Sequence, residues 1–534
     1  MAKDVSRDRW IKASLLTGSG LLWLALVAIP LGSVLIRLRS VTALLDPEIL
    51  QIVRFTAIQA SVSTAISILI GFPLGLVLGR PLALADRFSG LRRMLLAMPY
   101  GVPTVVAGTA WVIWLGRSGI LAESGLRLDW AYTAAGVVTA HVFFNAPWVA
   151  LLVSESRARI ANDLIDAAGT LGAGSWGRFK WITWPAVKWV LASSATQVFS
   201  LCVMSFALVL ILGGGPPVQT LETALYARMR YGSLDLDGAV ACGIWELTLT
   251  LLPWALLLLI QPSWSAAERE TAGVRPRGSG SSRRQSGWLV FATTLVSALF
   301  MVPYVAVIFS SGMKPWQALL APGSIEQLST PLKWTAILAI LSGIGTLGLT
   351  LLSVLAARAL AKVPAMQRLF TTLWVLPSGI SVLVLGLGFW LAYGKWLDPF
   401  SGSLTAMVAL QAILFTPVAF RMIWPVARSS PEILLEAATG LGASKLQRFL
   451  AVEWPRLRSP IFSALAIVMG ASVGEVAAVS LFYGEGIFPL PLLLSRWMGQ
   501  YRFEEAQALS AVLLVLASGT IALVSRWGFY DKRS

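Results

Sequence analysis

The sequence predicts an all-α polytopic membrane protein with about twelve transmembrane helices, arranged as two homologous halves of six. Hydrophobic residues make up 56 % of the 534 residues and charged residues only 13 %, whereas a soluble domain carries about 25 % charge. The mean hydropathy is +0.74. Two observations therefore support this fold class: the apolar composition of the whole chain, and a segment that occurs once in each half.

The repeated segment defines the halves. Asp166-Ala-Ala-Gly-Thr-Leu-Gly172-Ala corresponds to Glu436-Ala-Ala-Thr-Gly-Leu-Gly442-Ala. The spacing also holds for flanking residues, because 436 − 166, 442 − 172, 455 − 185 and 417 − 147 all equal 270. A constant offset over about forty residues indicates a duplicated unit, so we expect the same membrane domain in each half.

The expected spans are apolar windows of about 20 residues, the length that crosses about 30 Å of hydrocarbon. The first half contains Leu15–Ile36, Ala57–Leu78, Leu95–Leu115, Ala131–Val153, Trp189–Leu212 and Val240–Ile260. The second half contains Trp288–Phe309, Lys333–Ala356, Leu369–Ala392, Leu404–Val426, Pro460–Leu481 and Ala506–Val524. The first window is longer than the apolar core of about 7–15 residues in a signal peptide, so we expect a retained span.

Two transmembrane domains follow from these windows, residues 1–265 and residues 288–534. The segment between them, residues 266–287, is rich in Gly, Ser and Arg, a composition typical of a flexible linker. We expect this linker to be cytoplasmic. The window that begins at Trp288 is also compatible with the start of a separate protein that became joined by fusion.

Basic residues are concentrated on one side of the expected topology. With the N-terminus inside, inner segments contain 29 of the 42 Lys and Arg residues, outer segments contain 12, and Arg421 lies within a span. Because basic loops remain in the cytoplasm, we expect both termini and both repeated segments to be cytoplasmic. Basic loops that face anionic membrane lipid then explain the net charge of +16, and no nucleic-acid partner is expected.

Sequence patterns that would indicate an enzyme are incomplete in this chain. The chain has no Gly-x-x-x-x-Gly-Lys-Ser/Thr phosphate loop, since its single Gly-Lys pair, Gly394-Lys395, is not followed by Ser or Thr. His141 is the only histidine, and Cys202 and Cys242 lie in separate spans without metal-ligand spacing. We therefore expect neither catalysis nor a metal or cofactor bound by this chain.

Glycine patterns inside the spans are expected to pack helices. Gly343-Ile-Gly345-Thr-Leu-Gly348 matches the dinucleotide-binding pattern, but it lies in an apolar window rather than between a strand and a helix. Gly71, Gly75 and Gly79 recur at four-residue spacing. Small residues let neighbouring helices approach closely, and this packing role is expected for both sets.

The repeated segments are expected to form compact bent elements. Ala437, Ala438 and Leu441 indicate a short helix that ends at Gly442, and the basic and aromatic stretch Lys445–Trp454 follows. A glycine after a helix lets the chain turn through a left-handed conformation. An ordinary solvated loop is the alternative, but two copies with the same apolar and glycine positions favour a docking surface.

The motif Glu436-Ala-Ala-x-x-x-Gly442, followed by Phe449 and Trp454-Pro455, resembles the coupling loop of permeases in binding-protein-dependent ABC importers. The resemblance implies a fold like that of type I ABC importers and two loops that dock on a dimer of ATPase subunits. Asp166 stands where the family prefers Glu. The docking residues would be Asp166, Ala167, Ala168 and Gly172 in the first loop and Glu436, Ala437, Ala438 and Gly442 in the second.

The same resemblance implies the partners and the cellular location of the chain. ATP and Mg would bind to the partner ATPase, and a periplasmic or extracellular solute-binding protein would deliver the solute. The expected location is the bacterial cytoplasmic (inner) membrane. The chain itself would be a transport permease and not an enzyme.

Sequences around the motif are most similar to the thiamine permeases, which implies thiamine or its phosphate esters as the solute. A fused ferric-iron permease is an alternative within the class, and an ion-coupled secondary transporter is an alternative from another class. Glu475 stands where the family more often has Asp. The segments that carry the similarity are 140–147, 205–216 with 220–226, and Gly474-Glu475 followed by Leu481-Phe482.

Glu475 and Glu246 are carboxylates inside expected spans, where a charge costs about 2.5–3.5 kcal/mol on insertion scales. Such residues usually face a cavity or a partner. We expect Glu475 to line the translocation path, because the thiazolium ring of thiamine is cationic, and Glu246 to make a structural hydrogen bond. Trp497, Tyr501 or Phe482 near the outer mouth would add aromatic faces that attract a cation.

Overall fold

The computed structural model describes residues 2–38, 41–79, 89–117, 119–125, 130–213, 218–231, 234–260, 287–309, 312–397, 400–429, 432–484 and 486–529. These residues form helices without a named β-strand, and Gly484 and Ile487 form an isolated antiparallel bridge. Ten helices are long and apolar enough to cross a membrane, or twelve if each of two bent pairs is one span. The all-α membrane fold is confirmed, while residues 266–286 of the expected linker lie outside the described part.

The first half contributes six spans and five short helices. The spans are α1 (Ala2–Trp23), continued through a π-helical turn (Leu24–Ala28) into α2 (Ile29–Arg37), then α3 (Pro47–Leu78), α5 (Thr104–Leu115), which the shorter α4 (Ser89–Gly101) precedes, α7 (Ala134–Ala158), α10 (Trp184–Val203) and α13 (Leu236–Ile260). The short helices are α6 (Ile120–Glu123), α8 (Asn162–Thr170), α9 (Ser175–Arg178), α11 (Ala207–Leu212) and α12 (Leu221–Arg230).

The second half repeats this order. Its spans are α15 (Gly287–Leu299) with α16 (Val302–Phe309), α19 (Ser329–Ala359), α20 (Pro364–Val375) with α21 (Val382–Tyr393), α22 (Leu404–Arg428), α25 (Trp454–Val473) and α28 (Phe503–Phe529). The short helices are α17 (Lys314–Leu319), α18 (Pro322–Ile325), α23 (Glu432–Gly440), α24 (Lys445–Arg448), α26 (Ala477–Ser480) and α27 (Leu490–Gly499).

Five expected windows are broken rather than continuous, and one of them, Trp288–Phe309, divides between α15 and α16 with a bend of 56°. The window Leu95–Leu115 divides between α4 and α5, with Pro103 at the start of α5. The window Leu369–Ala392 divides between α20 and α21, which are bent by 102° around the turn that contains Pro377. Proline lacks the amide hydrogen that a continuing helix needs, so both breaks have a local cause.

The other two breaks lie at the ends of α10 and α25. α10 ends at Val203 and α25 ends at Val473, and each is followed by a short helix, α11 or α26. Windows Trp189–Leu212 and Pro460–Leu481 therefore overran the helices, because the apolar composition continues across the break. Glu475 lies in the connection between α25 and α26 and not within a span.

The N-terminal spans of each half pack against the opposite half. The Trp23 indole donates a hydrogen bond to the carbonyl of Leu373 on α20 over 2.9 Å. The Tyr393 hydroxyl donates to the carbonyl of Ala25 over 2.6 Å. Conversely, Phe300 between α15 and α16 meets Phe143 of α7 with ring centroids 5.6 Å apart. The first span of each half of the sequence therefore packs against the other half in the folded structure.

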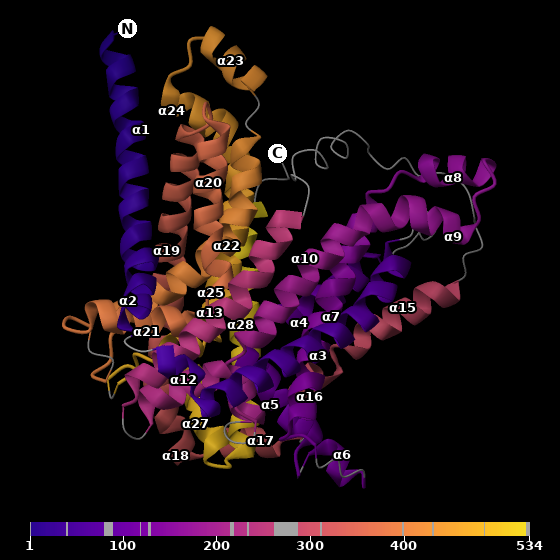
Figure 1. Ribbon diagram of the computed structural model, residues 1–534, viewed down its shortest axis with the longest axis vertical. Helices are drawn as coiled ribbons and strands as arrows, with labels where there is room; N and C mark the ends of the chain where they lie inside the picture. Colours follow the sequence, from indigo (N-terminus) through magenta and orange to yellow (C-terminus); the bar gives the residue numbers. More distant parts are fainter. Residues whose placement is uncertain are drawn as a thin grey trace.

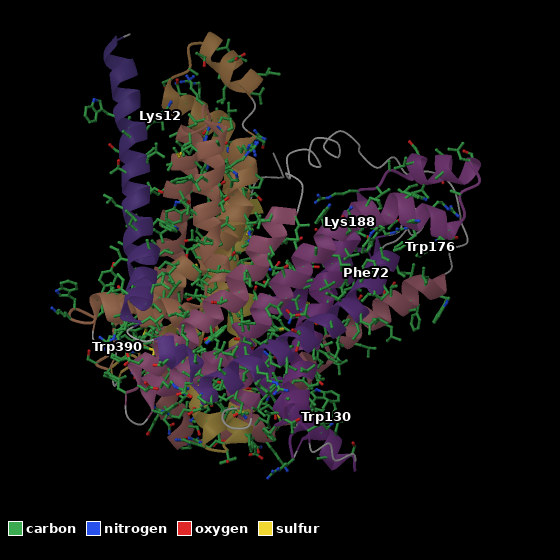
Figure 2. All side chains as sticks on the ribbon, in the orientation of Figure 1. Lys12, Phe72, Trp130, Trp176, Lys188 and Trp390 are labelled. Carbon is green, nitrogen blue, oxygen red and sulfur yellow. The ribbon has the colours of Figure 1, made fainter. Side chains whose placement is uncertain are left out.

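The two halves form arms that diverge toward the end carrying α8 and α23 (Figure 1). The N-terminus of α1 lies at that same end, whereas α6, α17 and α18 lie at the opposite end. Among labelled side chains, Lys12 and Lys188 lie toward the end with α8 and α23, and Trp130 lies toward the other (Figure 2). Lys12, Lys188 and the repeated loops thus share one end of the molecule.

Close helix approach explains the glycine patterns. A Cβ atom added at Gly75 would lie 2.7 Å from the carbonyl oxygen of Ala150 on α7, and one at Gly71 would lie 2.5 Å from that of Ala146. At Gly343 the added atom would lie 2.6 Å from the side chain of Met469 on α25. Small residues at these positions let α3 approach α7 and let α19 approach α25, which confirms the packing role for these glycines. Gly348 has open space around it, so the expectation was wrong there.

Candidate functional site

The first repeated loop is a short helix closed by a left-handed glycine. α8 ends with the amide of Leu171 donating to the carbonyl of Ala167 over 3.1 Å and that of Ala173 donating to Ala168 over 2.9 Å. Gly172 between them has φ +81°. This is the helix-ending geometry in which glycine avoids the steric cost of a Cβ atom.

The second loop has the same geometry. The amide of Leu441 donates to the carbonyl of Ala437 over 3.1 Å and that of Ala443 donates to Ala438 over 3.0 Å. Gly442 has φ +80°. The bent helix–glycine element expected from the sequence is confirmed in both halves.

Both loops present apolar side chains to solvent. Leu171 is 87 % exposed and Leu441 is 88 % exposed, and the carboxylates of Asp166 and Glu436 are exposed beside them. Trp176 on α9 is also exposed and lies near the tip of its arm (Figure 2). An apolar surface rimmed by polar residues is typical of a protein interface.

The segment behind each loop is also duplicated. A π-helical turn follows α9 and α24, at Phe179–Thr183 and Phe449–Glu453. Its first ring meets the tryptophan of the following helix, with centroid distances of 6.4 Å for Phe179–Trp184 and 6.3 Å for Phe449–Trp454, both at 42°. The matched rings fix the direction in which each loop leaves its span.

The anchors of the two loops differ. In the second half, Arg358 at the end of α19 forms an ion pair with Glu453 over 2.6 Å. In the first half, Arg157 at the end of α7 donates to the hydroxyl of Thr183 over 2.9 Å. Because 453 − 183 is 270, the anchored positions correspond, but only the second loop carries a charged pair there.

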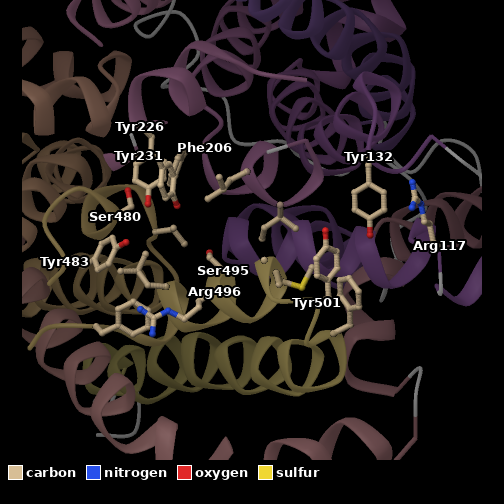
Figure 3. A pocket seen from close by; sticks show the side chains of 18 residues that line it. Arg117, Tyr132, Phe206, Tyr226, Tyr231, Ser480, Tyr483, Ser495, Arg496 and Tyr501 are labelled. Atoms are coloured by element: carbon tan, nitrogen blue, oxygen red, sulfur yellow. The ribbon is translucent and has the colours of Figure 1, made fainter. Parts of the chain in front are cut away.

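A cavity of about 770 Å³ lies where the two halves meet, away from the repeated loops (Figure 3). Five of the chain's nine tyrosines line it, together with three phenylalanines, and its charged lining residues are two arginines. The described residues that carry these groups are Arg117, Tyr132, Phe206, Tyr226, Tyr231, Tyr483, Phe488, Arg496, Tyr501 and Phe503.

Helix starts position the walls of this cavity. The amide of Leu221, at the start of α12, donates to the hydroxyl of Thr56 on α3 over 3.0 Å. The amide of Leu490, at the start of α27, donates to the hydroxyl of Thr335 on α19 over 2.8 Å. Each half therefore holds its short outer helix with one threonine of a long span. Tyr226 on α12 packs edge-on against Phe206, with centroids 4.9 Å apart.

Arg230 connects the halves beside the cavity. Its guanidinium lies 4.1 Å from the ring centroid of Tyr483 and 5.3 Å from that of Phe400, and it donates to the carbonyl of Tyr483 over 3.3 Å. A second cavity of about 510 Å³ shares Tyr483, Phe488 and Arg496 with the first. The turn that begins at Tyr483 thus separates two neighbouring cavities.

Glu475 lies directly before Val476, which lines the larger cavity. Its carboxylate accepts hydrogen bonds from the amides of Ala477 over 2.8 Å and Ala478 over 3.3 Å, so it caps α26. The neighbouring Gly474 packs directly against Pro103, which brings the helix breaks of the two halves together. Glu475 is half-buried and is absent from the described cavity lining.

A second pair of carboxyl groups lies deeper at the same interface. Glu222 on α12 and Glu246 on α13 are each 1 % exposed and lie within hydrogen-bonding reach of one another. The hydroxyl of Ser381, at the start of α21, donates to Glu222 over 2.6 Å. Neither oxygen of Glu246 has a hydrogen-bond donor in the described part of the chain, so the structural hydrogen bond expected for this residue is not observed. Glu222 was not predicted as a buried carboxyl group, because the short segment around it mixes polar and apolar residues and resembles an outer loop.

The aromatic residues expected at the outer mouth divide into two groups. Tyr501 lines the cavity. Trp497 and Phe482 are completely buried in the core, and the Trp497 indole donates to Gln327 over 3.3 Å. The expectation was wrong for these two residues. Trp497 lies on the core side of α27, whose Ser495 and Arg496 line the cavity, and Phe482 lies in the core just after α26.

Comparisons with known proteins agree with the duplicated fold. The model of the family "Binding-protein-dependent transport system inner membrane component" matches residues 71–266 and 349–527. The chain is 30 % identical over 492 residues to a thiamine transport system permease protein ThiP of Brucella abortus (strain 2308), covering 90 % of this chain and 88 % of that protein.

Two further relatives are less identical to the chain. The thiamine transport system permease protein ThiP of Escherichia coli (strain K12) is 27 % identical over 488 residues, with 88 % of each chain covered. The sulfate transport system permease protein CysW of Synechococcus elongatus is 25 % identical over 192 residues, covering 35 % of this chain and 65 % of that protein.

Proposed function

Because the chain belongs to the family of binding-protein-dependent transport system inner membrane components, we propose that it passes thiamine or its phosphate esters across the bacterial cytoplasmic membrane in an ATP-driven importer. The observation that carries the substrate is the similarity to thiamine permeases over 90 % of the chain. A separate ATPase dimer would hold ATP and Mg, and a periplasmic or extracellular binding protein would deliver the solute.

The matched loops support docking on the ATPase dimer. Each presents an exposed leucine, Leu171 or Leu441, at the turn after a short helix, and the shared offset gives the two loops equivalent places on two equivalent subunits. ATP-driven closure of the ATPase dimer would then draw the diverging arms together. Both termini would lie on this cytoplasmic side.

The cavity supports an aromatic organic solute. Phenol and phenyl rings bind flat and cationic ring systems through stacking and cation–π attraction, and a volume of about 770 Å³ is within the range of small-molecule sites. The similarity to thiamine permeases over 90 % of the chain favours thiamine over the ferric-iron alternative. Glu475 would act on the path just beyond Val476.

The test is uptake of labelled thiamine by vesicles that contain the chain with its ATPase and binding protein. We expect ATP-dependent accumulation that ferric chelates do not compete for. Accumulation of iron and not of thiamine would overturn the substrate, and accumulation driven by an ion gradient without ATP would overturn the class.

The docking role has its own test. Leu441→Glu and Leu171→Glu should each reduce co-purification of the ATPase, because a charge replaces the apolar contact. Leu234→Glu, a half-exposed leucine at the opposite end, is the matched control and should leave co-purification unchanged. Equal retention in all three variants would contradict the docking role.

A further inference from the structure

Tyr501 has an unusual backbone conformation. Its φ is +61°, and it is the one non-glycine residue with positive φ in the described part of the chain, where the other such positions are glycines. A bulky side chain in this left-handed region is a true outlier, and such outliers persist where the surroundings impose them and often lie at functional sites.

The turn at Tyr501 is imposed by its neighbours. It follows α27, where the amide of Tyr501 donates to the carbonyl of Met498 over 3.1 Å and that of Arg502 donates to the carbonyl of Trp497 over 2.9 Å. Arg502 is held in turn by Glu505 over 2.9 Å. Glycine is the usual residue at this point of a helix-ending turn, so the backbone does not need the tyrosine ring.

The ring itself lies at the edge of the larger cavity. Tyr501 is 80 % exposed and lines the cavity together with Tyr132, and the two phenol groups face each other there (Figure 3). The Phe503 ring meets Tyr501 edge-on, with centroids 6.0 Å apart. The strained residue therefore places an exposed aromatic face at the cavity mouth.

We propose that Tyr501 is a solute-contacting residue whose ring, opposite Tyr132, stacks on a flat heteroaromatic ring of the solute as it enters the cavity. This inference rests on the proposed function, in which the solute is thiamine. Stacking needs an exposed aromatic face in a fixed orientation, and the imposed turn supplies that orientation. A glycine would relieve the backbone but remove the face.

The test compares Tyr501→Gly, Tyr501→Asn and Tyr501→Phe in vesicles that contain the chain, its ATPase and its binding protein, with thiamine at saturating concentration. Asn also tolerates the left-handed region. We expect thiamine uptake to fall at least about fivefold in the Gly and Asn variants, and to stay within about twofold of the unsubstituted chain in the Phe variant. Trp396→Gly, an exposed ring that lines neither described cavity, should leave uptake unchanged.

Two readouts separate solute contact from a structural role. In the Gly and Asn variants, stimulation of ATP hydrolysis by the loaded binding protein should stay within about twofold, and the unfolding temperature should not fall. Undiminished uptake, a lowered unfolding temperature, or weakened affinity for the binding protein in these variants would overturn the inference. Failure of the unsubstituted chain to take up thiamine would instead overturn the proposed function, and this inference with it.

Discussion

At the scale of single residues, Glu222 and Glu246 place two carboxyl groups together inside the membrane domain. Ser381 donates to one oxygen of Glu222, and no donor in the described part of the chain reaches the other three oxygens. Two carboxyl groups in contact and out of water cannot both be ionised without a large cost. A proton held between the two groups would supply the missing donor, and the hydrogen bond from Ser381 joins the pair to the second half.

Substitution of Glu246 tests this arrangement. Glu246→Gln should preserve thermal stability, because the amide donates permanently to Glu222. Glu246→Ala should lower the free energy of unfolding by about 1–3 kcal/mol, since a buried acceptor then loses its partner. Thermal unfolding of the purified chain measures both. Equal unfolding temperatures for the two variants would contradict the shared proton.

At Glu475, a negative charge near the proposed translocation path can be removed by a substitution that keeps the shape of the side chain. Glu475→Gln should keep the unfolding temperature, because the amide oxygen can still accept from Ala477 and Ala478. It should slow thiamine uptake about fivefold, equivalent to about 1 kcal/mol, because the solute loses an attractive charge. Glu475→Asp, which keeps the charge, is the control for uptake. Normal uptake by the Gln variant would remove Glu475 from the path.

Gly442 and Gly172 determine the bend of the repeated loops. Valine at either position should strain the left-handed turn by about 1–2 kcal/mol and weaken ATPase co-purification while membrane insertion is retained. We expect the larger loss at Gly442, whose loop carries the fuller motif. Gly440→Val is the matched control, because Gly440 lies within α23 with open space around it. Equal co-purification by all three variants would exclude a role for the bend.

At the scale of elements, the contact between α3 and α7 depends on glycine. A Cβ atom at Gly75 would meet the Ala150 carbonyl and Val153, each at 2.7 Å, whereas Gly348 on α19 has open space. Gly75→Ile should therefore destabilise the fold by about 1–3 kcal/mol through overpacking. Gly348→Ile adds the same apolar group and should change stability by less than about 0.5 kcal/mol. Thermal unfolding of both variants distinguishes a packing glycine from an incidental one.

At the scale of the whole molecule, α6 and α9 lie at opposite ends (Figure 1), and their flanking serines Ser124 and Ser175 are exposed. Both native cysteines, Cys202 and Cys242, are buried and can be replaced by alanine. Single cysteines at positions 124 and 175 should then react with a membrane-impermeant reagent from opposite sides, with position 175 on the cytoplasmic side. Labelling of both from one side would overturn the topology.

The sequence by itself determined the features that depend on local composition and spacing. Apolar windows of membrane-spanning length indicated all the spans, because crossing hydrocarbon is a requirement on each segment separately. The offset of 270 identified two loops whose glycines have φ values of +81° and +80°, since a left-handed turn after a helix is a local property of glycine. The glycines that end the two repeated loops could therefore be chosen without a structure.

Only the tertiary structure decided which distant segments meet. The contact between the helix breaks at Pro103 and Gly474, the exchange of N-terminal spans between halves, and the pairing of Glu222 with Glu246 and Ser381 all depend on contacts between separate elements. The cavity gathers its five tyrosines from residue 132 to residue 501, and the turn after α27 places Tyr501 at it while α27 buries Trp497. The hydropathy of a side chain indicates whether it is buried away from water. It does not indicate which side chains become its neighbours, because close packing in the folded chain determines those contacts.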